Sequence, residues 1–350
     1  MGIKGTILGL GIVGVCFYAT AIHRSRELPQ TVIEEGVAVI EKIQEIKLSG
    51  YKTYNPGVIA LESGYLLVSR EKALSFFDYI TLKIQRKRKN IITLSELDEN
   101  FKQVGVSKQL IPLENHSMNK VTDPRLFRHE GDIYMTFCDH TNGGSVQTMC
   151  RLQKEKGKWS IDRITPLYFD GGIEFTDRNL VSKNIEKNWM PFSLHGKLYM
   201  VYLLEPEKVV IEVDMESGRC TLTSRTPNGL IDRFSPLRGG SPPVYDEELG
   251  EFITLYHVAF PGRNSYTKLK KNIYICGAYS FTQEAPFSIT GKSSGPFYQK
   301  ELYDNREKII FATALIRKGD HYLMFYGEDD CRIKVAKIDR KALLSAMKRR

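Results

Sequence analysis

The sequence predicts an all-β fold, a five-bladed β-propeller with short flanking helices, and three observations support this class. The 350 residues are 42% hydrophobic and include 18 Tyr and 17 Phe, which is typical of folded, strand-rich proteins. One hairpin pattern recurs along the body: a short strand with Pro near its start leads through a turn with Gly to an aromatic and aliphatic strand. Proline lacks the amide donor of a sheet and is confined to strand starts and edges, so its recurrence indicates a strand end that opens onto a shared axis.

Five copies of this hairpin follow one another between residues 50 and 340. The first four contain Asn55-Pro56, Asp123-Pro124, Met190-Pro191 and Pro242-Pro243, and the fifth, which begins at Phe311, lacks the proline. A lone hairpin cannot bury both of its faces, whereas four-stranded sheets packed around an axis can. Five units therefore predict five blades, and a β-sandwich with chance similarity is the alternative.

Residues 1–25 are expected to form a membrane anchor. The run from Thr6 to Ile22 is apolar and uncharged, and its 17 residues are close to the shortest helix that spans a bilayer. We expect a single-pass N-terminal anchor in a membrane. Cleavage as a signal peptide, which would leave a secreted or luminal protein, is the alternative.

Two further segments outside the hairpins are expected to be helical. Residues 26–49 include the run TVIEEGVAVIEKIQEI, whose apolar residues at helical spacing predict an amphipathic connector between anchor and propeller. Residues 341–350 predict a C-terminal helix with a basic end.

The net charge of +9 does not by itself indicate nucleic acid, because the basic residues are scattered apart from Arg86–Lys89 and the C-terminal Lys348–Arg350. Charge runs of this kind are usually solvated, so we expect no nucleic-acid partner; a membrane surface or an anionic ligand fits the charge as well. The six cysteines include no CxxC pair and no zinc-ligand spacing. We therefore expect no metal and no other cofactor.

Polar residues stand beside the first strand of each hairpin. If these strands line the axis, their polar neighbours converge on one cleft, where amides, carboxylates and cations suit the hydroxyls of a sugar and aromatic rings cover its apolar face. The residues placed in this way are Asn55, Asp123, Lys187, Asn188, Arg238, Ser241 and Glu328–Asp330, with Trp189 and Tyr54 as the rings.

Five segments, in the same order, resemble glycoside hydrolase family 130 and its relatives: YNPGVIALESGYLLVSR, DPRLF, EKNWMPF with GKLYMVY, RGGSPPV with EFITLYH, and YGEDDCRIKVAKID. The resemblance covers roughly residues 50 to 340. It implies a five-bladed propeller and an enzyme related to β-mannoside phosphorylases and mannosyltransferases. Such an enzyme would act by inversion on an oligosaccharide or glycoside, with inorganic phosphate or a nucleotide sugar as possible second substrate.

The resemblance also implies roles for individual residues. The general acid of the family lies in an Asp-Pro-Arg motif, which makes Asp123 the expected acid. We expect substrate to be bound by Asn55, Arg125, Asn188, Trp189, Ser241, Tyr326 and Asp330. Binding of phosphate or another anion is expected of Lys187, Arg238 and His257.

One departure from the family pattern leaves the reaction open. The chain has Leu204-Glu205-Pro206 where the phosphorylases have an arginine-proline pair that contributes to phosphate binding. An inverting hydrolase needs a second carboxylate about 6.5–9.5 Å from the acid, and Glu186 and Asp329 are the candidates. Phosphorolysis, hydrolysis and transfer all remain candidates, and a propeller that binds glycan or protein without catalysis is the alternative from another class.

Overall fold

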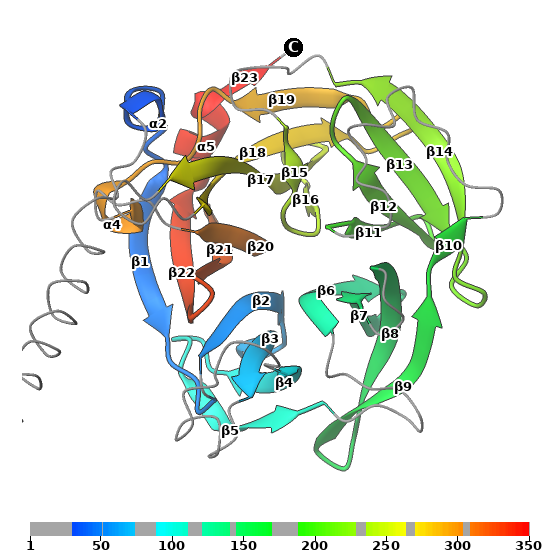
Figure 1. Ribbon diagram of the computed structural model, residues 1–350. Helices are drawn as coiled ribbons and strands as arrows, with labels where there is room; N and C mark the ends of the chain where they lie inside the picture. The colour runs from blue at the N-terminus through cyan, green and yellow to red at the C-terminus, as the bar shows by residue number, and fades with distance from the viewer. Residues whose placement is uncertain are drawn as a thin grey trace, which may run out of the picture.

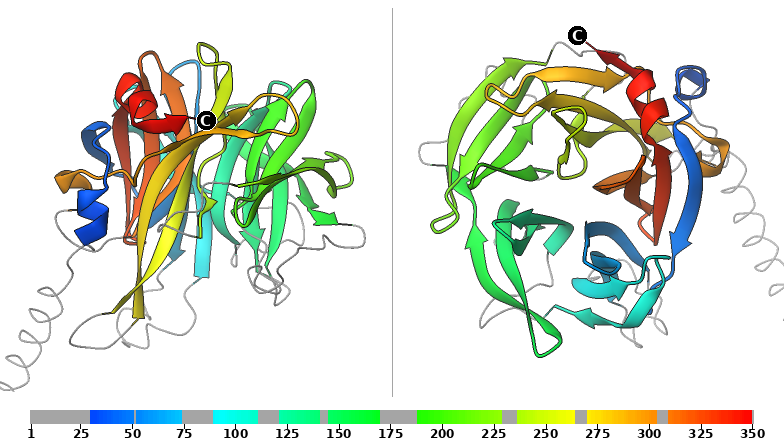
Figure 2. Two further views of the ribbon diagram at one scale, coloured as in Figure 1. Left: turned by 90° about the horizontal axis from the view of Figure 1, so that it is seen from above. Right: turned by 180° about the vertical axis from the view of Figure 1, so that it is seen from behind.

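The computed structural model describes residues 30–50, 52–73, 89–110, 121–140, 145–169, 188–228, 236–263, 270–303 and 309–349. These residues form five antiparallel sheets arranged around a central axis (Figure 1). The view from behind shows the same ring of sheets, and the view from above shows the propeller from its side (Figure 2). The predicted five-bladed propeller is confirmed.

The first two blades each take four consecutive strands of the chain, ordered from the axis outward. Blade 1 consists of β2 (Thr53–Ala60), β3 (Tyr65–Ala73), β4 (Lys89–Leu97) and β5 (Gln103–Gln109). Blade 2 consists of β6 (Val121–His129), β7 (Asp132–Asp139), β8 (Val146–Glu155) and β9 (Lys158–Pro166).

Blades 3 and 4 carry additional short strands. Blade 3 consists of β11 (Met190–Leu194), β12 (Lys197–Leu203), β13 (Glu207–Val213) and β14 (Arg219–Pro227), with β10 (Tyr168–Phe169) parallel to β14. Blade 4 consists of β15 (Arg238–Gly239), β16 (Val244–Asp246), β17 (Glu251–Arg263), β18 (Lys270–Thr282), β19 (Ile289–Ser293) and β23 (Met347–Arg349).

Blade 5 closes the ring with a strand from the other end of the chain. Its strands are β20 (Ile310–Lys318), β21 (His321–Glu328), β22 (Arg332–Asp339) and β1 (Ile40–Ile46), which pairs antiparallel with β22. The described helices are short: α2 (Gln30–Glu34), α4 (Lys300–Tyr303) and α5 (Arg340–Ala346).

The helix predicted within residues 26–49 is wrong for most of its length. Only Gln30–Glu34 is helical, and Ile40–Ile46 is the outer strand of blade 5. Ile40 and Ile46 are buried at the two ends of this strand. Ring closure provides β22 as a pairing partner, and this tertiary contact outweighs the helical spacing of the apolar residues.

The helix predicted for residues 341–350 is confirmed only in part. Helix α5 ends at Ala346, and Met347–Arg349 continue as β23, which pairs with β19 of blade 4. Both flanking segments therefore add strands to the propeller beyond the predicted limits of residues 50 and 340. Residues 1–25, on which the prediction of a membrane anchor rests, lie outside the described residues. In the described ranges, no helix has the length and apolar character needed to cross a membrane.

The apolar core lies between neighbouring blades. Leu66 and Val68 of blade 1 share one cluster with Leu126 and Met135 of blade 2, and three further clusters fill the remaining boundaries. Each sheet therefore buries one face against the blade before it and one against the blade after it. This packing holds the innermost strands side by side at the axis.

A buried ion cluster also joins blades 4 and 5 to α5. The carboxylate of Asp246 is fully buried, and it accepts hydrogen bonds from Nε and Nη2 of Arg340 at 2.8 and 2.9 Å and from the hydroxyl of Tyr322. Burial alone would raise the pKa of Asp246, but the hydrogen bonds from Arg340 and Tyr322 outweigh it and lower the pKa to about 2.

We predict that Asp246→Asn lowers the free energy of unfolding at pH 7 by on the order of 3 kcal/mol, because Arg340 loses its buried anionic partner. The folded-state pKa of Asp246 is lowered, so its contribution is complete above the unfolded value near 4 and is lost as the pH falls toward 2. Urea denaturation at pH 7 and pH 3 checks this: the wild type should lose more stability between the two than the variant. Glu248→Gln is the matched control, since this partner of Arg340 is 60% exposed and should contribute little. Equal losses in wild type and Asp246→Asn would contradict the prediction.

Candidate active site

A cavity of about 200 Å³ lies where the blades meet. All five blades contribute to its wall, as expected for side chains gathered at a propeller axis. The lining residues are Asn55, Arg70, Asp123, Asn188, Arg238, His257, Tyr274, Ile309, Phe311 and Asp330. Six of the residues that the sequence predicts for the site are among them: Asn55, Asp123, Asn188, Arg238, His257 and Asp330.

The backbone turns three of these side chains out of the regular strand pattern. Asn55, Asp123 and Asn188 have φ values of 50°, 55° and 66°, in the left-handed region that Asn and Asp tolerate better than most residues. Irregular pairing accompanies this conformation at Asn55 in β2 and at Asp123 in β6. A β-bulge changes the direction of the side chain at the bulged position. This explains how residues that belong to paired strands reach one cavity.

Asp123 lies in a network with two residues of blade 1. Its Oδ1 accepts hydrogen bonds from Nδ2 of Asn55 at 2.9 Å and from Nη1 of Arg70 at 3.1 Å. The side chains of Asp123 and Arg70 are each 16% exposed, so the ion pair is largely shielded from water. The guanidinium of Arg70 also lies 4.7 Å from the centre of the Tyr54 ring, which is itself buried.

Sequence reasoning missed Arg70. It ends the YNPGVIALESGYLLVSR segment, on the second strand of the first hairpin, and the prediction considered only residues beside first strands. In the structure, β3 pairs with β2, and Arg70 lies opposite Tyr54 in the register. A basic residue one strand away from Asn55, at the same end of the first hairpin, is the signal that would have found it.

Arg125 lies behind the acid. It is 1% exposed and is not among the residues that line the cavity. Its Nε donates to the carbonyl of Gly240 at 2.8 Å, its Nη2 to Oδ1 of Asn188 at 3.2 Å, and its Nη1 to the carbonyl of Asp123 at 3.3 Å. Burial lowers the pKa of Arg125 to about 10. The predicted contact of Arg125 with substrate therefore has no counterpart in the described wall.

His257 and Arg238 face the cavity from blade 4. The His257 ring is 1% exposed, stacks on Tyr274 at 5.4 Å and meets Phe311 edge-on at 4.8 Å. Burial and the neighbouring charges of Arg238 and Arg125 lower the pKa of His257 to about 3. Its Nδ1 is buried without a hydrogen-bond partner, whereas Arg238 is exposed. The exposed guanidinium of Arg238 can bind an anion, and the neutral imidazole of His257 lies beside it in the cavity wall.

Three residues predicted to bind substrate lie in the core and not in the described cavity wall. Trp189 is 2% exposed and packs against Tyr202, with ring centres 4.9 Å apart. Ser241 is fully buried, and its Oγ accepts the backbone N–H of Leu255 at 3.2 Å. Tyr326 is fully buried within the largest apolar cluster. Large aromatic side chains fill the space between blades in this fold, and this demand accounts for Trp189 and Tyr326.

The carboxylates predicted near the site differ in their placement. Asp330 lines the cavity. Asp329 does not, and its Oδ1 accepts the backbone N–H of Ile309 at 3.2 Å. Lys187 and Glu186 lie outside the described residues, so their roles stay predictions.

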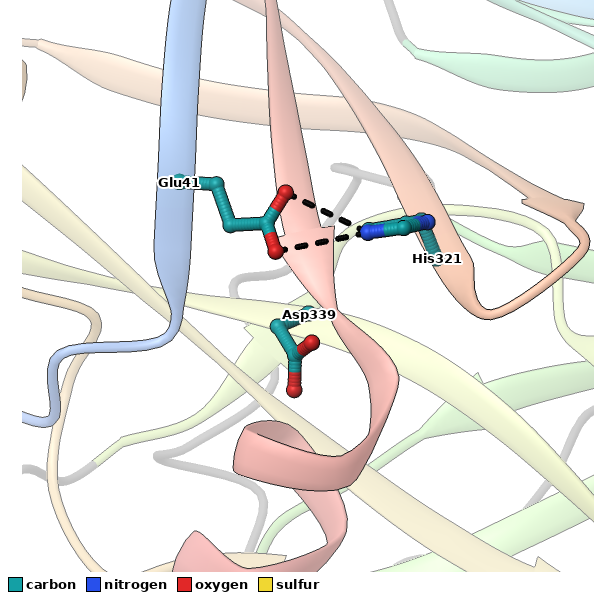
Figure 3. Close-up of side chains that lie close together, drawn as sticks. All are labelled: Glu41, His321 and Asp339. Carbon is teal, nitrogen blue, oxygen red and sulfur yellow. Dashed lines mark hydrogen bonds and ion pairs between the residues drawn. The ribbon is translucent and has the colours of Figure 1, made fainter.

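Figure 3 shows a separate group of side chains, Glu41, His321 and Asp339, whose ligand atoms lie within 4.8 Å of one another, as in a metal site. Each already has a structural partner. Lys337 Nζ lies 2.9 Å from Glu41, His321 contacts the same carboxylate at 3.2 Å, and Asp339 accepts the N–H of Ala342 at the start of α5. The ammonium of Lys337 neutralises the carboxylate that a metal would need, and we assign no metal to this group.

Comparison with known proteins accords with this geometry. The chain matches the family model of glycoside hydrolase family 130, described as β-1,4-mannooligosaccharide phosphorylase, over residues 26–349. The chain belongs to this family. A search among curated proteins gave no match. The resemblance inferred from the ordered segments is confirmed.

Solved structures share the fold at low sequence identity. One is a β-1,2-mannobiose phosphorylase from Listeria innocua with β-1,2-mannobiose, 14% identical with a TM-score of 0.55, covering 92% of this chain and 99% of that one. A mannose phosphorylase from Leishmania mexicana with a phosphate ion is 11% identical, with a TM-score of 0.51 and coverage of 96% and 94%. A putative glycoside hydrolase from Parabacteroides distasonis is 17% identical, with a TM-score of 0.56 and coverage of 90% and 93%.

We predict that the His257 imidazole in the family 130 propeller stays neutral between pH 5 and 8, because its folded-state pKa is lowered to about 3. Side-chain ¹⁵N NMR should therefore show one set of His257 signals that does not titrate in this range, with His257→Gln as the assignment control. The unfolded chain takes up a proton near pH 6.5, so this group makes the fold less stable as the pH falls below that value. A titration of His257 between pH 6 and 7 would contradict the prediction.

Proposed function

We propose that this protein is an inverting β-mannoside phosphorylase in which Asp123 is the general acid and an anion site at Arg238 and His257 holds inorganic phosphate. The observation that carries the proposal is one shared cavity. It contains a carboxylate fixed by Arg70 and Asn55, and also an exposed arginine beside a neutral histidine. Family membership supports the mannoside as substrate. The relatives from Listeria and Leishmania, described with mannobiose and phosphate, support the two ligands.

The proposed reaction breaks one bond and forms one. Asp123 supplies the proton that the leaving glycosidic oxygen needs, and a phosphate oxygen attacks the anomeric carbon from the opposite face. The bond between C1 and the glycosidic oxygen of the leaving sugar breaks, and a bond between C1 and a phosphate oxygen forms. A β-mannoside therefore gives α-mannose 1-phosphate and a shortened glycan. Asp123 then regains a proton from solvent.

The departure at Glu205 does not exclude phosphate. Glu205 is 8% exposed and lies outside the described cavity wall, so its carboxylate does not face an anion bound in the cavity. Arg238, on β15 of the neighbouring blade, supplies a cation to the wall. Lys187, expected from the sequence to contribute a second cation, belongs to the same proposal.

Hydrolysis is the second candidate, and Asp330 favours it. This carboxylate lines the same cavity as Asp123 and is a candidate to activate a water in place of Asp329. Glu186 stays a candidate from the sequence. Transfer from a nucleotide sugar and binding without catalysis stay predictions from the sequence alone.

We predict that the protein converts β-mannobiose to mannose and α-mannose 1-phosphate only when phosphate is present, as followed by ³¹P and ¹H NMR. Asp123→Asn should lower kcat by about 10²–10⁴-fold, because this is what a general acid contributes and its loss leaves a poor leaving group. Arg238→Ala should raise KM for phosphate about tenfold or more, with less effect on mannoside binding. Release of two mannose molecules without phosphate would favour hydrolysis, and full activity of Asp123→Asn would overturn the assignment of the acid.

We further predict that Gly327→Ala lowers kcat/KM at least tenfold. A Cβ at this position of blade 5 would lie 2.4 Å from Oδ1 and 2.8 Å from N of Asn55, so Asn55 must shift and release Asp123. Gly319→Ala is the control: it lies in the same blade with φ of 57°, and its added Cβ meets nothing within 4 Å. The control should lose stability but keep kcat/KM within twofold. Equal kcat/KM in both variants would contradict the role given to Asn55.

A further inference from the structure

Arg125 connects the innermost strands of four blades. Its guanidinium donates to Asp123 of blade 2, to Asn188 of blade 3 and to Gly240 of blade 4. It also lies 5.9 Å from the centre of the Phe311 ring of blade 5. Asn188 and Phe311 line the cavity, whereas Arg125 does not. Arg125 therefore acts on the cavity through its neighbours.

The chemistry of arginine fixes the orientation of the Asn188 amide. A guanidinium has five donors and no acceptor, so the amide must turn its oxygen toward Arg125. Oδ1 is then engaged by Arg125, and Nδ2 is the polar atom of the amide left for the cavity that Asn188 lines. Asn55 has the reverse orientation, because its Nδ2 donates to the Asp123 carboxylate and its Oδ1 is buried without a partner.

We infer that Arg125 is a positioning residue that holds Asn188 as a hydrogen-bond donor to a sugar hydroxyl. This inference rests on the proposed function, since it names how the same cavity recognises its glycoside. A substrate hydroxyl must accept from Asn188, and this polarity selects how the sugar ring lies against Asp123. A Lys in place of Arg125 cannot serve three acceptors in one plane.

A second buried cation provides a matched control. Lys208 is fully buried, donates from Nζ to the carbonyl of Phe287 at 2.6 Å and lies 3.9 Å from the centre of the Phe281 ring. It resembles Arg125 in burial and partners, but it joins blades 3 and 4 away from the described cavity wall. Its replacement tests the effect of removing a buried cation from the core.

The experiment measures kcat and KM for β-mannobiose and the Tm of the full-length chain in the wild type and five variants. Arg125→Met and Arg125→Lys should each raise KM about tenfold or more while kcat changes less than threefold. Asn188→Asp keeps an oxygen for Arg125 but removes the donor, so it should raise KM to the same extent with Tm unchanged. The double variant Arg125→Met with Asn188→Asp should show no further increase, because both changes remove one interaction. Lys208→Met should lower Tm and leave KM within twofold.

The outcomes separate the inference from the proposed function. A KM within twofold of wild type in Asn188→Asp, which leaves the core intact, overturns the inference even if Arg125→Met fails to fold. Effects of Arg125→Met and Asn188→Asp that multiply in the double variant also overturn it. A wild type that turns over no β-mannoside overturns the proposed function instead. The crystal structure of Arg125→Lys then decides the inference: positioning requires that the Asn188 amide leaves its place in the cavity wall, and an unchanged amide refutes it.

Discussion

The buried guanidinium of Arg125 is the interaction on which the rest of the site depends. Burial of a charge is costly unless hydrogen bonds replace its water, and Arg125 has three acceptors from three blades in place of a carboxylate partner. Burial disfavours the charged form of Arg125 and lowers its pKa to about 10. In return, one planar group fixes how blades 2, 3 and 4 approach one another at the axis. The orientation of the Asn188 amide follows from this contact.

The backbone conformation of three residues directs their polar side chains toward the cavity. Asn55, Asp123 and Asn188 occupy the left-handed region, which costs on the order of 1–3 kcal/mol per residue when a fold imposes it. Asn55 and Asp123 also precede proline, which disfavours helical conformations of the preceding residue. Strain of this kind persists only where the surrounding structure holds it. Here the interblade clusters and the network of Arg70, Asn55 and Asp123 hold it, and the result is a set of polar side chains aimed at one cavity.

The sequence predicted the part of this structure that is encoded in repetition. Five hairpins, four of them with Pro at the first strand, indicated five blades. Asn55, Asp123, Asn188, Arg238 and Asp330 were placed together because of their positions beside the first strands, and His257 was added by the family resemblance; all six line the cavity. The same reasoning could not predict which side chains point to the cavity and which point into the core. Trp189 follows Asn188 directly, yet it is buried in the core while Asn188 lines the cavity.

Other parts of the structure depend on partners that are distant in sequence. The apolar spacing of residues 31–46 is helical, yet β1 forms because β22, almost 300 residues later, offers a sheet edge. Arg125 was expected at the substrate because it belongs to the Asp-Pro-Arg motif. Its burial depends on Gly240 and Asn188, which no local pattern connects to it. Arg70 was missed for the related reason that its role follows from strand pairing.

The most direct test of the account is a crystal structure of the protein with inorganic phosphate and mannose. We predict that mannose occupies the cavity with Asp123 on one side of its anomeric carbon, and that phosphate lies on the opposite side against Arg238 and His257. Phosphate bound on the same side as Asp123, or a sugar bound away from this cavity, would contradict the assignment of acid and anion site on which the proposed reaction depends.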